Sequence, residues 1–270
     1  MPSSPRRAPA VGLRGTYQLS DCESPESRAR AGARCVPVGP SGVPATPGQP
    51  RAPGVCQRRR AALDPGRHGA PRQHIGTAPL GLSEPLFYPD YWFPPTLFRL
   101  GEATGFDIES LIFSFAVGGL ASSLFGVSDK YVLKPLADCE KSSRRHRYHK
   151  FLLSSPVWLF LGLEGLTSWN AIYTASLGLL GGAMTTVVCR PDLLSQAIKG
   201  ALMFTGLYFL FFSAMAASHP GFVALYWNHA NISGVQVAGI PVEELLFAFS
   251  LGAMWSAFYE HRHWLRVKTS

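Results

Sequence analysis

The first 80 residues contain no Phe, no Trp and no Lys, although the 270-residue chain holds 17 Phe and 6 Trp. They do contain 13 of the 22 Pro and 12 of the 25 Lys and Arg residues, all twelve of them Arg. A segment with so few large apolar side chains cannot bury enough surface to offset the entropy of ordering its backbone. We therefore predict that residues 1–80 are disordered.

Two interpretations of this segment stay open. It is either a real disordered tail or the product of a start site placed too early, because Arg, Pro, Ala and Gly share GC-rich codons. In both cases it contributes much of the formal net charge of +8. A nucleic-acid partner is not expected, because it would need a basic folded face with interleaved aromatic residues.

Paired cysteines and nucleotide-binding glycine motifs are also lacking. The five Cys include no CxxC spacing, so the sequence indicates neither a zinc site nor a disulfide framework. We predict no metal site and no cofactor. The histidines at positions 146, 149, 261 and 263 are expected to lie in solvated basic loops.

Residues 81–270 contain all of the Phe and Trp, together with five apolar stretches of membrane-spanning length. A helix that rises 1.5 Å per residue needs roughly 20 residues to cross the hydrocarbon core of a bilayer. We predict an all-α fold, a polytopic transmembrane helix bundle. Its spans are expected at about 106–127, 151–168, 171–189, 197–217 and 240–259.

The connecting segments support five spans. Twelve Lys and Arg lie in segments 128–150, 190–199 and 260–270, whereas segments 81–104 and 218–238 contain only Arg99. With five spans all twelve fall on one side, as the positive-inside rule requires. We therefore expect an integral protein of the cell (plasma) membrane, in contact with the lipid bilayer, with its C-terminus in the cytoplasm.

Two stretches of the chain are nearly alike: "GFDIESLIFSF" at 105–115 and "GIPVEELLFAF" at 239–249. Six of 15 aligned positions are identical, and Trp92 aligns with Trp227 if one residue is inserted. Because the two helices would be four spans apart, both would run in the same direction. This predicts an internal parallel repeat, with a partial first copy at 86–127 and a second copy at 171–260.

The repeat places acidic residues at matching depths. Glu109 would lie level with Glu243 and Glu244, and Glu164 would lie roughly 7 Å from the same outer end of its helix. An acid in a first helical turn is favoured by the helix dipole and needs no other role, and we expect Asp107 to cap its helix. A carboxyl group within a span usually marks a site. We predict that these groups meet in one apolar layer.

The stretch "GIPVEELLFAF", preceded by "YWNHANISGVQVA", resembles the signature of the small integral-membrane lycopene cyclase domain family. Its members occur as paired microbial subunits and as the cyclase half of fungal bifunctional proteins. Residues 171–260 resemble one whole family unit, and residues 86–127 only the last third of another. The resemblance makes residues 81–270 a lycopene-cyclase-like membrane domain.

The resemblance implies an isomerase (intramolecular lyase) of carotenoid biosynthesis that cyclises linear lycopene, a polyene hydrocarbon, without a cofactor. An acid would protonate a terminal alkene, the chain would close on the cation, and a base would remove a proton. Carried over to matching positions, Glu243 and Glu244 would be proton donor and base, with Glu109 as their equivalent in the first copy. The substrate would contact Glu164, Trp92, Trp227, Phe113 and Phe247.

The first copy departs from the family's Pro-x-Glu-Glu motif. It reads Asp107-Ile108-Glu109-Ser110, so one carboxyl group is lost at Ser110, and the Arg/Pro-rich segment replaces its two leading helices. This pattern fits three cases: a chain that is active alone, a chain that needs a second cyclase subunit or a homodimer, and an inactive relative. The alternative is a non-catalytic membrane protein of the same fold that binds or transports carotenoids or lipids.

Overall fold

The computed structural model describes residues 77–128 and 131–269. The chain forms two compact units, and the larger one contains Arg59–Leu136 and Lys141–Ser270. Of the smaller unit the structure describes only Ala137–Glu140, at the start of the short helix α6 (Asp138–Lys141). We predicted disorder for residues 1–80, and positions 1–76 of that range lie outside the described residues. From Thr77, which is buried, the chain is part of the larger unit.

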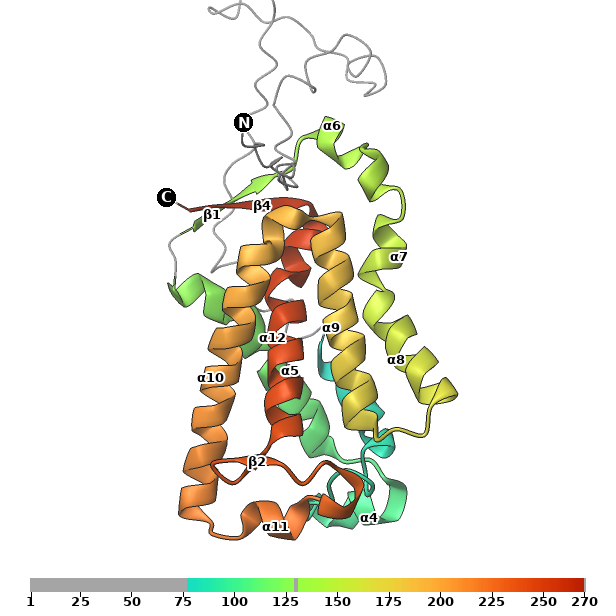
Figure 1. Ribbon diagram of the computed structural model, residues 1–270, viewed down its shortest axis with the longest axis vertical. Coiled ribbons are helices and arrows are strands. Elements are labelled where there is room, and N and C mark those ends of the chain that lie inside the picture. Colours follow the sequence, from blue (N-terminus) through green and yellow to red (C-terminus); the bar gives the residue numbers. More distant parts are fainter. Residues whose placement is uncertain (1–76, 129–130, 270) are drawn as a thin grey trace, which may run out of the picture. The chain divides into compact units, whose positions relative to one another are not determined.

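The larger unit is mainly helical, as expected for an all-α fold (Figure 1). Its long helices are α5 (Ile108–Ser128), α8 (Ser155–Leu166), α9 (Ala171–Cys189), α10 (Leu194–Ser218) and α12 (Val242–His263). The short helices are η2 (Ala78–Leu86), η3 (Leu97–Arg99), α4 (Leu100–Thr104), η4 (Arg144–His146), α7 (His149–Leu153), η5 (Pro191–Leu193), α11 (Phe222–Tyr226) and η6 (His229–Asn231).

Two short antiparallel strand pairs complete the described part of this unit. β1 (Tyr131–Pro135) pairs with β4 (Leu265–Thr269), and β2 (Gln236–Val237) pairs with β3 (Ile240–Pro241). The first pair ties the segment after α5 to the segment after α12. The second pair forms the turn that leads into α12.

Every apolar stretch identified in the sequence forms a helix. The stretch 171–189 coincides with α9, whereas 151–168 is divided at Ser154 between α7 and α8. A short segment, Thr167–Asn170, joins α8 to α9, and Asn170 caps α9 by accepting the N–H of Ile172 at 3.2 Å. The predicted cap of α5 is also confirmed, because Asp107 accepts the N–H of Ser110 at 2.6 Å.

Fewer helices pass a test of span length and composition than the five spans expected. Among the described residues, Ala171–Cys189 and Pro191–Ser218 are long and apolar enough to cross a membrane. A third candidate is the pair Leu97–Thr104 and Ile108–Leu124, which is bent by 98°. Of the other two stretches, α8 has only 12 residues, and α12 carries three carboxyl groups.

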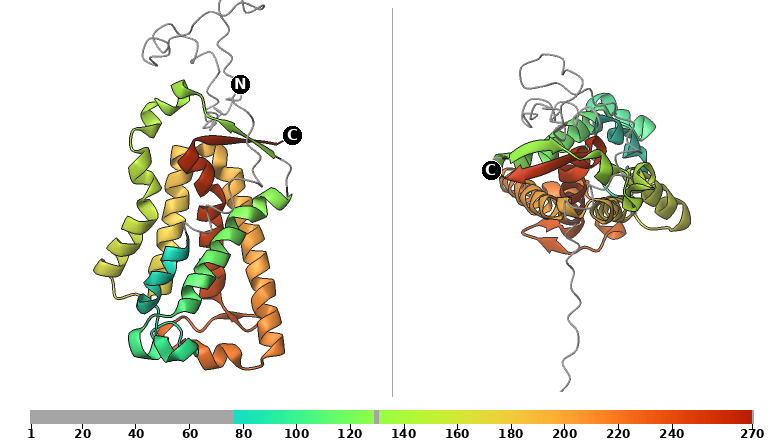
Figure 2. Two further views of the ribbon diagram at one scale, coloured as in Figure 1. Left: turned by 180° about the vertical axis from the view of Figure 1, so that it is seen from behind. Right: turned by 90° about the horizontal axis from the view of Figure 1, so that it is seen from above.

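Helix α12 is the central helix of the unit. It packs against α5, α9 and α10, and almost every residue from Ala248 to His261 is buried (Figures 1 and 2). Helices α5 and α12 run in the same direction, as the repeat predicted (Figures 1 and 2). The three carboxyl groups of α12, those of Glu243, Glu244 and Glu260, are buried among the surrounding helices.

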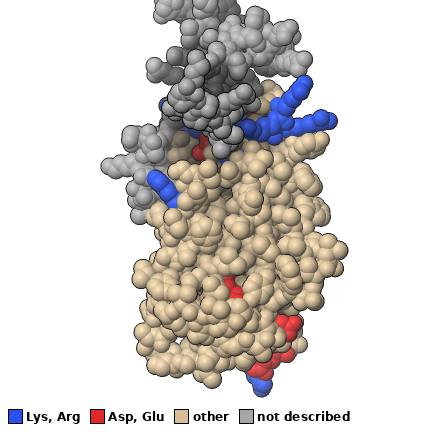
Figure 3. Space-filling model, viewed as in Figure 1, with Lys and Arg blue, Asp and Glu red and all other residues tan. Residues whose placement is uncertain are grey.

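The outer faces of the helices are strongly apolar. Large side chains that are more than half exposed include Ile112 of α5, Trp158 and Leu161 of α8, and Leu210 of α10. Figure 3 shows that Lys and Arg gather near the end of the bundle where α12 finishes, and that the helix faces between the two ends carry few charges. Exposed apolar surface of this extent marks contact with a partner or a membrane.

Helices α10 and α12 approach each other most closely at two glycines. A Cβ atom added to Gly252 would lie 2.8 Å from the carbonyl oxygen of Gly200 and 3.0 Å from the Cα atom of Ala201. These neighbours are backbone atoms, which cannot turn aside as a flexible side chain can. A residue with a side chain at position 252 would force the two helices apart.

Gly252→Ala should therefore lower the free energy of unfolding by about 1–3 kcal/mol, the usual cost of overpacking a well-packed core. Gly206→Ala on α10 is the matched control, since nothing lies within 4 Å of its added Cβ. Alanine is the better helix former by about 1 kcal/mol, so this control should unfold at the same or a higher temperature. Thermal unfolding of the full chain in detergent measures both variants, and equal midpoints would contradict the close approach.

Candidate active site

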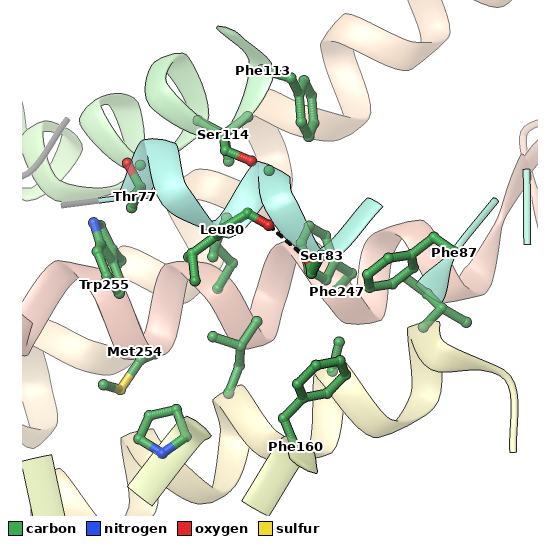
Figure 4. Close-up of a pocket in the computed structure, with 18 of the residues that line it drawn as sticks. Thr77, Leu80, Ser83, Phe87, Phe113, Ser114, Phe160, Phe247, Met254 and Trp255 are labelled. Carbon is green, nitrogen blue, oxygen red and sulfur yellow. Dashed lines mark hydrogen bonds between the residues drawn. The ribbon is translucent and has the colours of Figure 1, made fainter. Parts of the chain in front are cut away.

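An apolar cavity of about 630 Å³ lies among η2, α5, α8 and α12. Figure 4 shows Phe113 from α5, Phe160 from α8, and Phe247 and Trp255 from α12 around it. Most of the lining is aliphatic or aromatic, with a few hydroxyl groups. An apolar cavity with few polar groups is the usual form of a site for an apolar small molecule.

The Glu244 carboxyl group is the most extensively hydrogen-bonded group on the cavity wall. Its Oε1 atom accepts hydrogen bonds from the Tyr91 hydroxyl at 2.6 Å and from the Trp227 indole N–H at 2.9 Å. Its Oε2 atom accepts one from the Tyr208 hydroxyl at 2.7 Å. A buried carboxyl group needs such partners, because removing it from water costs several kcal/mol otherwise. The three donors fix its orientation.

The donors to Glu244 come from segments far apart in the chain. Tyr208 belongs to α10, whereas Tyr91 and Trp227 lie in the segments that follow η2 and α11. An antiparallel bridge pairs Trp92 with Trp227, and the Asn228 N–H donates to the Tyr91 carbonyl at 2.9 Å. This bridge holds two of the donors beside the first turn of α12.

Glu84 is the second carboxyl group on the cavity wall, and sequence reasoning missed it. It lies in η2, is 8% exposed, and accepts the Trp92 indole N–H at 2.7 Å. The pair repeats the contact between Trp227 and Glu244. In the aligned first copy the position of Glu244 is taken by Ser110, which also lines the cavity. Glu84 thus supplies a carboxyl group on the side where the repeat had lost one.

The packing of η2 on α5 places Glu84 there. A Cβ atom on Gly81 would lie 2.6 Å from the Ser110 carbonyl oxygen, so only glycine permits this approach. η2 lies outside the repeated 15-residue motif and is a 3-10 helix with an internal proline. The sequence signal that could have revealed it is the isolated acid between apolar residues in "LGLSEPLFY".

Glu243 lies beside Glu244 in sequence but faces a different environment. Its Oε1 atom accepts the Tyr173 hydroxyl at 2.6 Å and the Ser233 backbone N–H at 2.9 Å. Glu243 is 1% exposed and does not line the cavity. Consecutive residues in a helix point about 100° apart, and of this pair only Glu244 is directed onto the cavity wall.

The acids of three helices, which we expected to meet in one apolar layer, do not share the cavity, because Glu109 and Glu164, like Glu243, lie off its wall. Glu109 is exposed and accepts the Leu97 backbone N–H at 2.6 Å, and Glu164 accepts the Thr174 hydroxyl at 2.6 Å. Neither side chain lines the cavity. Alignment of the repeat compares positions along the helices, and it does not fix the direction in which each side chain points.

The aromatic residues proposed to contact substrate all lie on the cavity wall. They are Trp92, Trp227, Phe113 and Phe247, two from each copy of the predicted repeat. The rings of Trp92 and Trp227 are 5.8 Å apart. Tyr91 and Tyr208, which complete the Glu244 network, were not identified from the sequence, because a lone tyrosine in an apolar segment carries no distinguishing pattern.

The prediction of solvated loop histidines is wrong for two of the four. His149 is 8% exposed and His261 is fully buried, near the end of α12 opposite to Glu244. α7 packs against α9 and α12, and this packing encloses rings that a local reading of the sequence places in solvent.

The fold and the cavity define a helical protein with buried carboxyl groups facing an apolar chamber. Residues 170–262 match the family model described as lycopene cyclase, which confirms the resemblance for this third of the chain. The matched segment includes Glu243, Glu244, Trp227 and Phe247. Comparisons with curated proteins and with solved structures found no match.

The effect of Glu244 substitutions on the thermal unfolding midpoint tests the hydrogen-bond network. Glu244→Leu leaves three buried donors without an acceptor, and each orphaned group costs about 1–3 kcal/mol. We expect a large fall in the thermal unfolding midpoint for Glu244→Leu and a smaller one for Glu244→Gln, which keeps an acceptor oxygen. Glu102→Leu at an exposed position should change the free energy of unfolding by no more than about 0.5 kcal/mol. A Leu variant at 244 as stable as this control would contradict the network.

Proposed function

We propose that this protein is a membrane-embedded, cofactor-independent lycopene cyclase. The observation that carries the proposal is that Glu244, inside the segment that matches the lycopene cyclase family, faces an apolar, aromatic-lined cavity. A carboxyl group held by three donors in such a chamber suits proton transfer to and from a hydrocarbon.

Ring closure needs no oxidant, because the reaction is an isomerisation. A carboxylic acid gives its proton to the terminal alkene, and a tertiary carbocation forms. The neighbouring double bond attacks the cation and closes the ring, and a carboxylate then takes a proton from an adjacent carbon. One proton enters and one leaves, so the hydrocarbon keeps its formula and no co-reactant is consumed.

Glu244 and Glu84 are the pair that we assign to this proton transfer, since they are the carboxyl groups among the described cavity residues. Glu243 takes a positioning role: its bonds to Tyr173 and Ser233 fix the start of α12 and so the direction of Glu244. The faces of Trp92, Trp227, Phe113 and Phe247 would stabilise the cation by cation–π interaction.

The membrane-embedded part of the proposal rests on the arrangement of apolar surface. The outward faces of α5, α8 and α10 carry large exposed apolar residues, while the acids of α12 are buried inside the unit. A helix surrounded by other helices need not be apolar to cross a bilayer, because lipid meets only the outer faces. We therefore retain five spans, formed by α5, α7 with α8, α9, α10 and α12, in the cell membrane.

The internal repeat is a further part of the proposal. The parallel direction of α5 and α12, the bridge between Trp92 and Trp227, and the matched Trp–carboxylate contacts support two copies of one unit around a shared cavity. The proposed assembly includes a second cyclase subunit or a second copy of this chain. The activity test below uses the chain alone, where it can pair with its own copies, and the chain with a second subunit.

Loss of a cavity carboxyl group should abolish cyclisation. We expect the full chain, expressed in a lycopene-accumulating host, to produce cyclised carotenoids. Glu244→Gln and Glu84→Gln should each lower the yield by about 100-fold or more, because general acid–base catalysis contributes about 10²–10⁴. Pigments are extracted and separated by chromatography, and protein levels are compared by immunoblot.

Glu109→Gln and Glu164→Gln are the matched controls, since both carboxyl groups lie outside the cavity, and they should keep most of the activity. The experiment is run with the chain alone and with a second cyclase subunit. If only lycopene is recovered in both arrangements, the protein is not a cyclase. A binder or transporter of carotenoids would leave the pigments unchanged but would alter their amount or distribution.

The proposed topology predicts the location of both ends of the bundle. A reporter fused after residue 270, and one inserted after Lys141 in the basic segment, should both report a cytoplasmic location. A reporter inserted at Gly234, in the segment before α12, should report the opposite side. Gly234 is exposed with a positive φ of 71°, and a Cβ there meets no other atom within 4 Å, so an insertion is tolerated locally. Opposite locations for Lys141 and the C-terminus would contradict five spans.

A further inference from the structure

A second cluster of reactive side chains lies at the other end of the unit from Glu244. It consists of His146 in η4, His149 at the start of α7 and Cys189 at the end of α9. The Nδ1 atom of His146 lies 3.2 Å from the Cys189 sulfur, and the Nδ1 atom of His149 lies 3.5 Å from it. One ligand atom from each residue lies within 4.8 Å of the others.

Two members of the cluster are buried, His146 is half-buried, and aromatic contacts hold both imidazoles. Cys189 is 1% exposed and His149 is 8% exposed. The Trp264 ring stacks on His149 with 3.8 Å between centroids and meets His146 edge-on at 4.9 Å. These contacts fix the two imidazoles before any ligand binds.

We propose that His146, His149 and Cys189 form a metal site for a thiolate-binding, borderline-soft divalent ion, with Zn²⁺ as the best fit. A thiolate and two imidazoles are the donor set that zinc prefers, whereas Mg²⁺ and Ca²⁺ take oxygen ligands. Metal binding would release the Cys189 thiol proton to solvent and place the sulfur on the ion as thiolate.

The observed distances fit this assignment. Zn–S bonds of about 2.3 Å and Zn–N bonds of about 2.0 Å at a tetrahedral angle separate sulfur from nitrogen by about 3.5 Å. The measured separations of 3.2 and 3.5 Å are close to that value.

His261 provides a further nitrogen beside the cluster. Its ring lies 4.5 Å from that of His149 and at 83° to it. Its Nδ1 atom contacts the Thr186 hydroxyl at 3.2 Å, while its Nε2 atom is buried and has no hydrogen-bond partner among the described residues. Three protein ligands leave one position of a tetrahedral ion open, to be filled by water or by His261.

The site would act as a structural link rather than in ring closure. Seventeen residues of α12 separate Glu244 from His261, which corresponds to about 25 Å along the helix. An ion bound here would join the 142–149 segment to the end of α9 and, through Trp264, to the end of α12. The inference is therefore independent of the proposed cyclase activity.

The test uses the full chain, purified in detergent with an affinity tag that contains no histidine. We expect one Zn²⁺ per chain by mass spectrometry of the metal content after dialysis against metal-free buffer. Replacement by Co²⁺ should give a thiolate-to-cobalt charge-transfer band in the near ultraviolet. Cys189→Ala and His149→Ala should each weaken Zn²⁺ affinity by more than the roughly 10–100-fold that loss of an outer-sphere partner causes.

His219→Gln is the control, because His219 is exposed at the end of α10 and is not a member of the cluster. It should keep the ion and the cobalt band. Because a cluster variant that misfolds would also lose metal, the cobalt spectrum of the unsubstituted chain tests the site without any substitution. Absence of the charge-transfer band there, or equal loss of metal in His219→Gln, overturns the proposal. Chelation that lowers the unfolding temperature of the unsubstituted chain, but not of Cys189→Ala, supports it.

Discussion

The hydrogen bonds to the Glu244 carboxyl group are the constraint on which the cavity depends. A carboxyl group can be buried among phenylalanines only if its two oxygens find donors. Here the donors are Tyr91, Tyr208 and Trp227, so the requirement brings together the segment after η2, the middle of α10 and the segment after α11. The three donors that make burial of the acid possible also line the cavity beside it.

Helix α12 connects the two chemically distinctive regions of the protein. It carries Glu244 in its first turn and His261 in its last, and it lies among α5, α9 and α10 along its length. Its central position explains why it contains more polar groups than the outer helices, since its neighbours rather than lipid or water form its surroundings. The close approach at Gly252 allows α10 to bring Tyr208 within reach of Glu244.

The two sides of the cavity show how a lost group is replaced. One side uses Trp227 and Glu244 from the segment that matches the cyclase family. The other uses Trp92 with Glu84, which comes from η2 and not from the helix that aligns with α12. Both sides of the cavity pair an indole N–H with a carboxylate at the edge of the apolar chamber. The two carboxylates come from different positions relative to the repeated helix. This supports the proposal that Glu84 and Glu244 share the proton chemistry.

The sequence alone determined the all-α class, the places of the long helices and the resemblance of the second copy to the lycopene cyclase family. Apolar length, the capping residue Asp107, and the motif around Glu243 and Glu244 are local properties, and local properties can be read along a chain. It also indicated the four aromatic residues on the cavity wall. Only the tertiary structure decided which acids face the cavity, because that depends on how η2 and the loops pack across helices distant in sequence. For the same reason the contact of His149 with Cys189 was invisible in the sequence: forty residues separate them, and only the packing of α7 against α9 brings them together.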